Sequence, residues 1–169
     1  MDAARPQHNG SRHTVPATVS SVAPTEMLDL DRAECLRLLA ATTVGRIAVS
    51  VAEWDTPVIR PVNYVFDQPS NSILVRSGLG SKLHAVLRSA KAAFEIDGTD
   101  GPGRVGWSVI VAGVSEEITS PSELHRIEAL GLEPWTAGSK SHWIRIRANT
   151  VSGRRIALEV DHEPGYRAE

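Results

Sequence analysis

The order of the expected strands and helices is the feature of this sequence that most limits its fold. Runs rich in β-branched residues follow one another with short turns between them; one helical pattern precedes them and only two interrupt them. A doubly wound parallel sheet needs a helix after nearly every strand, so that fold is disfavoured. The sequence therefore predicts a mainly β protein, an antiparallel barrel with a few covering helices.

The expected elements follow from apolar periodicity and from cap residues. Asp31 and Glu34 have capping-box spacing at the start of the first helix, and Ser120 and Glu123 repeat that spacing at the start of the last helix. In chain order we expect a helix over 31–41, strands over 46–51, 58–66 and 72–77, a short helix over 83–87, strands over 91–97 and 107–119, a helix over 120–131, and strands over 142–147 and 150–156.

Two residues predict irregular points within these strands. Proline cannot donate a hydrogen bond to a β-ladder, so Pro61 predicts an edge or a bulge in the strand over 58–66. Gly113 predicts a bend in the long strand over 107–119.

Composition divides the chain into one domain with two tails. Residues 1–27 are rich in Pro, Ser and Thr and contain no apolar run, which predicts a disordered N-terminal tail without a secretory signal. Residues 28–157 form the expected domain, and residues 158–169 form a flexible C-terminal tail. Either tail could instead dock on a partner subunit. No apolar stretch approaches the roughly 20 residues that span a bilayer. We expect a cytoplasmic protein because a single cysteine fits a reducing compartment.

Charge and cysteine content exclude several function classes. The net charge is −2 and aromatic residues make up 5% of the chain, which disfavours binding to nucleic acid or to anionic membranes. Cys35 is the only cysteine, so neither an internal disulfide nor a cysteine metal cluster can form. A buried small side chain is the favoured interpretation of Cys35, with a nucleophile as the alternative.

The sequence also holds motifs that lack the structural context they need. Residues 101–106 match G-x-G-x-x-G, but a strand-forming run follows where a dinucleotide site needs a helix. Gly106-Trp107-Ser108 resembles a nucleophile elbow but lacks its second glycine. His84 and His125 lie in expected helices without a metal-ligand partner at helical spacing.

The stretch from Arg76 to Leu83 carries the strongest functional signal. An expected strand ends in Arg76-Ser77, two glycines follow, and a helix then begins with Ser81 and Lys82. A helix N-terminus flanked by cations favours a phosphate, although a plain capped connection gives the same pattern. Arg60 is a candidate third cation. A carboxylate, Glu95 or Asp97, is the alternative partner for its guanidinium.

These residues are similar to the pyridoxamine 5′-phosphate oxidase-like, FMN-binding split-barrel family, and more narrowly to its actinobacterial flavin/deazaflavin oxidoreductase branch. The similarity rests on Arg60-Pro61-Val62-Asn63-Tyr64, on Arg76-Ser77 with Gly80-Ser81-Lys82-Leu83, on Gly106-Trp107-Ser108-Val109, and on two late runs, 142–146 and 153–156. The resemblance implies a six-stranded Greek-key split barrel. It also implies a homodimer with two flavin sites at the subunit interface.

The resemblance also implies a set of FMN-binding residues. Arg60 and Lys82 would contact the phosphate, and Arg76, Ser77 and Ser81 would surround the ribityl-phosphate. The remaining positions concern the ring: Val62 and Asn63 along the isoalloxazine, Trp107 and Ser108 from the second subunit, and Trp143 as a wall of the ring or substrate pocket, with a core aromatic as the alternative for Trp143.

The resemblance implies an FMN-dependent oxidoreductase that transfers a hydride between flavin and a small molecule. A nicotinamide or a deazaflavin would be the electron donor. Oxidation of vitamin B6 is disfavoured, because Val65, Phe66 and Asp67 stand where the oxidases carry a substrate lysine, and their C-terminal signature is missing. The alternatives are a non-catalytic flavin-binding, storage or sensor module, or the same fold with a deazaflavin or haem.

Overall fold

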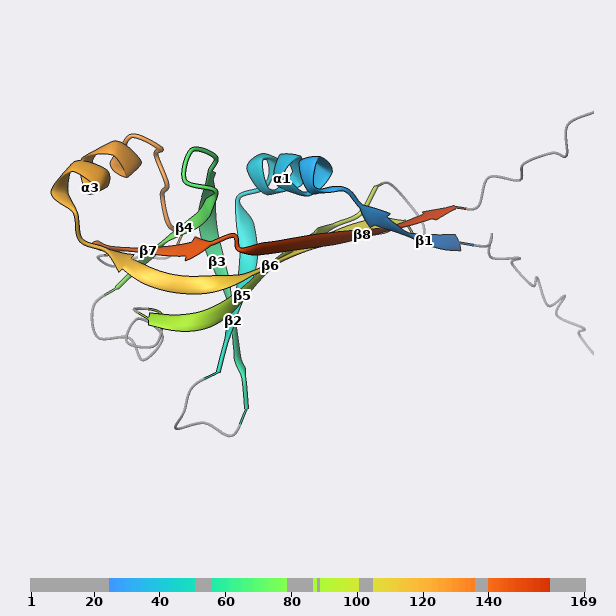
Figure 1. The fold of residues 1–169 in the computed structure, drawn as a ribbon, viewed down its shortest axis with the longest axis horizontal. Coiled ribbons are helices and arrows are strands. Elements are labelled where there is room, and N and C mark those ends of the chain that lie inside the picture. Colours follow the sequence, from blue (N-terminus) through green and yellow to red (C-terminus); the bar gives the residue numbers. More distant parts are fainter. Residues whose placement is uncertain are drawn as a thin grey trace, which may run out of the picture.

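The protein folds into a single antiparallel sheet that curls into a barrel (Figure 1). A computed structural model describes residues 25–50, 56–78, 87, 89–100, 105–135 and 140–158. Its elements, in chain order, are β1 (Thr25–Leu30), α1 (Arg32–Ala41), β2 (Val44–Val49), β3 (Val58–Asp67), β4 (Ser72–Ser77), β5 (Ser89–Gly98), β6 (Gly106–Ile118), α3 (Pro121–Glu128), β7 (His142–Arg147) and β8 (Thr150–Leu158).

Six of the strands close the barrel. Their order is β6-β5-β2-β3-β4-β7, and the pairing of β7 with β6 completes the circle. All of these pairings are antiparallel, so the predicted six-stranded antiparallel barrel is confirmed. β8 and β1 extend the sheet beyond the barrel from β6 (Figure 1).

β6 pairs with two different strands on the same side, and Gly113 lies where the partner changes. Residues 106–112 pair with β8, and residues 115–118 pair with β7. A Cβ atom at Gly113 would lie 1.8 Å from the carbonyl oxygen of Arg147, a distance that no side chain tolerates. The bend predicted near Gly113 therefore coincides with the point where the partner of β6 changes from β8 to β7, and this point requires glycine.

β3 has a free edge over part of its length. Residues 64–67 pair with β4, whereas residues 58–63 pair only with β2 among the described strands. The edge position predicted from Pro61 is confirmed, because Pro61 lies in this half-paired part. The Tyr64 N–H donates to the Thr43 carbonyl oxygen at 3.0 Å on the β2 side. Backbone groups alternate sides along a strand, so those of Asn63 face the open edge.

The main core fills the barrel beneath α1. Tyr64 and Phe94 meet edge to face with ring centroids 4.7 Å apart. Cys35 and Leu39 of α1 are fully buried against them in the same cluster. Burying a large apolar side chain contributes roughly 1.5–3 kcal/mol, so the contacts of α1 hold it on the barrel. The structure agrees with the favoured interpretation of Cys35, since burial also raises the pKa of its thiol.

A second, smaller core lies on the outer side of the barrel wall, under α3. It consists of Leu74, Ile118, Ile127 and Trp143. An ion pair holds α3 over this second core. The Arg126 guanidinium donates to both Asp67 carboxylate oxygens, at 2.9 and 2.7 Å.

The structure corrects the sequence analysis at two places. β1 was not expected, and its first three residues had been assigned to the N-terminal tail. Most of its side chains are exposed, so it has no apolar alternation and is held by backbone pairing with β8. The prediction of a capping box at the start of α3 is wrong. Ser120 is the N-cap but makes no cap hydrogen bond, and Glu123 bonds Arg145 instead.

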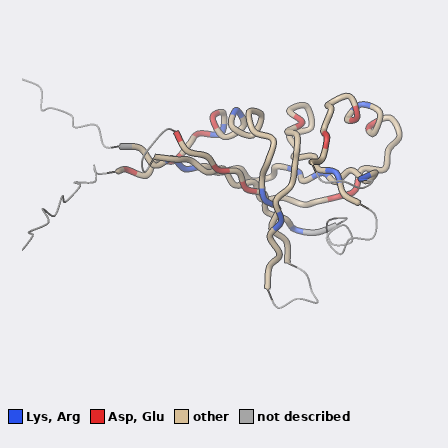
Figure 2. Tube along the Cα trace, turned by 180° about the vertical axis from the view of Figure 1, so that it is seen from behind, with Lys and Arg blue, Asp and Glu red and all other residues tan. Residues whose placement is uncertain are grey.

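Two further expectations concern the start of α1 and the short helix over 83–87. The capping contact at α1 is confirmed, because the Glu34 N–H donates to Asp31 Oδ1 at 2.7 Å. The short helix expected over 83–87 lies almost wholly outside the described residues. Along the backbone trace of Figure 2, positions of basic and acidic residues alternate through the described elements, with neither charge confined to one region. None of the helices that the structure describes is long and apolar enough to cross a membrane.

The Asp67–Arg126 pair predicts how stability depends on this link and on pH. Asp67 is 2% exposed. Arg126→Ala would leave its carboxylate buried without its main partner and lower the free energy of unfolding by about 2 kcal/mol, less than for a fully buried pair because Arg126 itself reaches solvent. Urea unfolding measures this. Arg37→Ala, which breaks only the exposed pair with Glu34, is the control and should have a much smaller effect.

Hydrogen bonds from Arg126 hold the pKa of Asp67 below its ordinary value, despite the opposing effect of burial. A depressed carboxyl pKa contributes stability above the unfolded value, and that stability is lost as pH falls through the folded value. The wild-type protein should therefore lose stability below about pH 4. The Arg126→Ala protein should lose less over the same range, and an identical acid profile would contradict this role.

Candidate functional site

The predicted binding residues of β3 and β4 flank the point where these two strands separate. The last paired residues are Tyr64 and Val75. Continuing that register would place Asn63 opposite Arg76 and Val62 opposite Ser77, but β4 leaves β3 there and continues beside β7. We call this point the split. Val62, Asn63, Arg76 and Ser77, four of the residues predicted from the sequence, therefore flank the split on two strands that diverge there.

Arg60 lies on the free edge of β3, near the split. Its side chain is exposed, and its Nη1 donates to the neighbouring Ile59 carbonyl oxygen at 2.9 Å. Glu95 and Asp97, the alternative partners considered for Arg60, both bond Arg46 instead. Among the residues that the structure describes, no carboxylate bonds the Arg60 guanidinium, which leaves a cation beside unpaired backbone.

Arg76 lies on the opposite face of the wall from Arg60. Arg60 shares a face with Ile47, its buried register partner, whereas Arg76 alternates with Leu74 of the outer core. Arg76 Nε donates to the Lys140 carbonyl oxygen at 2.9 Å, and Nη1 donates to the Leu132 carbonyl oxygen at 3.5 Å. These bonds tie the segment after α3 to β4, so Arg76 and Arg60 do not converge on one group within the chain.

Asn63 also faces the outer side, where it supports a pocket. Its Oδ1 accepts a hydrogen bond from the Trp135 backbone N–H at 3.0 Å. The pocket has a volume of about 270 Å³ and lies between β3 and the segment after α3. Its lining residues are Thr43, Asn63, Tyr64, Val65, Leu130, Gly131, Leu132, Glu133 and Trp135.

Trp143 belongs to the outer core and is 3% exposed. The Arg76 guanidinium lies over its ring, 5.4 Å from the centroid. This placement favours the core-aromatic alternative for Trp143 over a pocket wall.

Trp107 and Ser108 lie at the start of β6, away from the split. In the sheet order, β5 and β2 stand between β6 and β3, which corresponds to about 14 Å at ordinary strand spacing. Ser108 lines a different pocket, of about 640 Å³, beside β8 and β1. One chain therefore does not bring these two residues to Arg60. Ser81 and Lys82 lie outside the described residues.

Comparison with known proteins bears on this arrangement. The family model described as pyridoxamine 5′-phosphate oxidase matches residues 31–155, from the cap of α1 to β8. The chain belongs to this family. The match spans the whole barrel and both sides of the split.

The chain is similar to proteins of solved structure and to a curated relative from Mycobacterium tuberculosis. A FAD-binding protein from Mycobacterium smegmatis is 33% identical, covers 78% of this chain and 100% of its own, and superposes with a TM-score of 0.68. A FAD-binding protein from Mesorhizobium loti is 25% identical, with coverages of 76% and 97% and a TM-score of 0.62. The Mycobacterium tuberculosis protein Rv0080 is 32% identical over 155 residues, 89% of this chain and 95% of that protein.

The side chains around the split offer little acid–base chemistry. Tyr64 is 1% exposed and donates its hydroxyl to the Leu39 carbonyl oxygen at 2.8 Å. Burial raises its pKa to about 12, so the phenol stays neutral at physiological pH. No cluster of potential metal ligands occurs within the described ranges. What the described residues present at the split is half-paired backbone of β3 and the Arg60 guanidinium.

Sequence reasoning missed the segment that closes the outer pocket. Residues 130–135 carry neither helical nor alternating periodicity, and only Gly131, with φ of +69°, marks the turn that follows α3. Trp135 reaches Asn63 from 72 residues away along the chain, a contact that no local pattern predicts.

The double contact of Arg76 predicts that lysine cannot replace it. An ammonium lacks the planar fork that reaches two carbonyl oxygens and lies over an indole ring. We expect Arg76→Lys to lower the free energy of unfolding by about 1–2 kcal/mol, roughly the contribution of the lost hydrogen bonds. Amide hydrogen exchange of Trp135 should also become faster. Arg60→Lys is the matched control, and equal behaviour of the two variants would contradict this role of Arg76.

Proposed function

We propose that this protein is a cytoplasmic FMN-dependent oxidoreductase that transfers a hydride between the flavin and a small molecule. The free edge of β3 at the split, beside the Arg60 guanidinium that no carboxylate of the described residues bonds, is the observation that carries the proposal. Membership of the pyridoxamine 5′-phosphate oxidase family and the FAD-binding relatives support a flavin as the ligand.

The edge suits the polar rim of a flavin ring. Asn63 presents a backbone N–H and a carbonyl group toward the split, and the pyrimidine rim of a flavin carries matching acceptors and a donor. Arg60 lies three residues away, roughly 10 Å along the strand, a separation that an extended ribityl chain can bridge. The guanidinium then pairs with phosphate oxygens, the contact for which its geometry is best suited.

FMN fits these groups better than FAD because its terminal phosphate is a dianion. Arg60 and Lys82 would both contact that one phosphate, whereas the two negative charges of FAD are divided between its two phosphates. The relatives named as FAD-binding show that the fold accommodates the larger cofactor in those proteins. Extraction of the bound cofactor and chromatography against FMN and FAD standards separates the two.

A bound flavin would supply the redox chemistry, and the residues of the chain would bind and orient it. The backbone at Asn63 would fix the ring, and Arg60 would fix the phosphate. Tyr64 stays protonated beneath the split and keeps the wall rigid through its bonds to α1. A nicotinamide or a deazaflavin would be the electron donor, and the substrate would be a small molecule.

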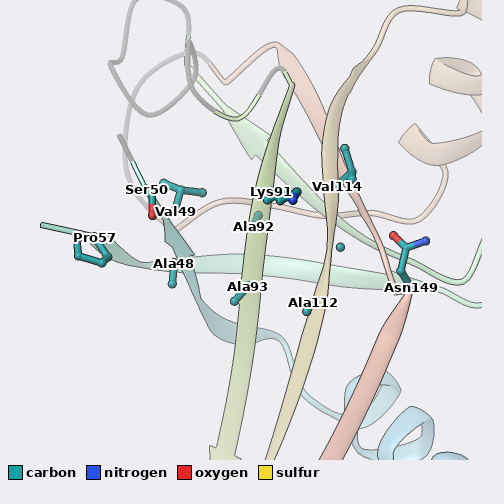
Figure 3. Close-up of a pocket in the computed structure, with 11 residues that line it drawn as sticks. Ala48, Val49, Ser50, Pro57, Lys91, Ala92, Ala93, Ala112, Val114 and Asn149 are labelled. Atoms are coloured by element: carbon teal, nitrogen blue, oxygen red, sulfur yellow. The ribbon is translucent and has the colours of Figure 1, made fainter. Parts of the chain in front are cut away.

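A homodimer is part of the proposal because Trp107 and Ser108 can reach a flavin only in a second subunit. The outer face of β2, β5 and β6 suits such contact. Ala48, Ala93 and Ala112 are register neighbours in a row across these strands (Figure 3). They form the floor of a hollow of about 500 Å³ that small side chains leave open to a partner.

The dimer can be tested by a charge placed on this floor. We expect light scattering to give the mass of a dimer for the wild-type protein. Ala93→Glu should give a monomer that also loses flavin, because the site would be incomplete. Ala33→Glu, on the exposed side of α1, is the matched control and should stay dimeric. A monomeric wild-type protein that binds flavin would contradict the dimer.

The flavin site can be tested by absorption and titration. The purified protein, or the protein mixed with FMN, should show flavin bands, and NADPH or NADH should bleach them without oxygen. Arg60→Ala and Lys82→Ala should each weaken FMN affinity about tenfold or more, the usual effect of losing a charge-assisted hydrogen bond. Arg37→Ala is the control. Unchanged affinity in both variants would refute the site, and binding without reduction by any donor would favour a non-catalytic module.

A further inference from the structure

Trp135 is the only exposed aromatic residue among the described parts of the chain. It is 77% exposed, whereas Tyr64, Phe94 and Trp143 are buried. A tryptophan has a large apolar surface, and leaving it in water forgoes the free energy of burying it. Core packing, which explains the buried aromatic residues, does not explain an exposed tryptophan beside a pocket.

The backbone that carries this indole is fixed on both sides. The Trp135 N–H bonds Asn63 Oδ1, and Arg76 holds the carbonyl oxygens of Leu132 and Lys140. Gly131 adopts a positive φ of +69° at the turn that brings the segment back over β3. The indole therefore lies exposed on an anchored backbone, which is the arrangement of a preorganised ligand contact.

The pocket beside the indole has the mixed lining of a binding site. Leu132 and Val65 supply apolar surface, and Thr43, Asn63 and Glu133 supply polar groups. Its volume of about 270 Å³ admits one or two fused rings or one edge of a larger ring system. Asn63 connects this pocket with the split, because its side chain lines the pocket while its backbone faces the free edge.

We propose that Trp135 stacks on a planar aromatic ring held against β3 at the split, and that Asn63 is the positioning residue for this contact. This inference rests on the proposed flavin function and deepens it: the ring is that of the flavin or of an aromatic substrate beside it. The pocket-wall role considered for Trp143 thus passes to Trp135, eight residues earlier in the chain and on the exposed side of the same outer layer.

Substitutions at position 135 separate stacking from bulk. FMN affinity and the affinity of the FMN-loaded protein for menadione, a planar two-ring probe, would be measured by fluorescence titration. Trp135→Leu should weaken one of these affinities about tenfold, the usual effect of losing a stacked aromatic, while Trp135→Phe retains most of it. Loss of FMN affinity assigns the ring to the flavin, and loss of menadione affinity alone assigns it to a substrate.

Asn63 variants test the positioning role. Asn63→Asp keeps the oxygen that accepts the Trp135 N–H, and Asn63→Leu removes it. Asn63→Leu should lose as much affinity as Trp135→Leu, and amide hydrogen exchange at Trp135 should become faster. In Asn63→Asp, that exchange should not become faster. Glu128→Ala, an exposed position at the end of α3, is the control for changes near the segment.

Three results would overturn the inference. The first is unchanged affinity for both probes in Trp135→Leu. The second is an equal loss of affinity in Trp135→Leu and Trp135→Phe. The third is a change in the mass of the dimer without a change in either affinity, which would make Trp135 a subunit contact. Failure of the wild-type protein to bind any flavin would instead refute the proposed function itself.

Discussion

The separation of β3 from β4 after the Tyr64–Val75 pair is the constraint on which the rest of the structure depends. A closed barrel satisfies every backbone group on both sides of each strand, and this barrel leaves residues 58–63 satisfied on one side only by the described strands. An unpaired edge is costly in a buried position and useful at a binding site, because donors and acceptors there are already oriented. Pro61 lowers the cost, since its missing N–H falls on this edge.

Two features hold the unpaired edge of β3 in position. Tyr64, at the last paired position, is locked by burial, by its ring contact with Phe94 and by its hydrogen bond to α1. On the other side of the barrel, Gly113 lets β6 pass from β7 to β8, so the wall closes while the sheet extends outward. The irregularity at each place is local, and the surrounding core is continuous and rigid.

Arg60 and Arg76 have different roles because their side chains lie on opposite faces of the barrel wall. Arg60 has no carboxylate partner in the described chain and lies beside free backbone. Arg76 is committed to two carbonyl groups and an indole ring, and so fastens the segment that carries Trp135. The outer core and the Asp67–Arg126 pair anchor α3, from which this segment begins. Stability of the outer layer and the geometry of the candidate site are thus coupled.

Local chemistry in the sequence determined the course of the strands, the start of α1 and the edge position of Pro61, since periodicity, a capping side chain and a missing N–H act over a few residues. Short motifs also carried the family resemblance, which pointed to Val62, Asn63, Arg76 and Ser77 as flavin-binding residues, and these residues flank the split. The tertiary structure decided which face each of these side chains occupies, because that depends on register between distant strands. It likewise decided the pairing of β1, whose side chains are mostly exposed, and the choice of Trp135 over Trp143 as the exposed aromatic. Both depend on contacts between residues far apart in the chain, which no local pattern encodes.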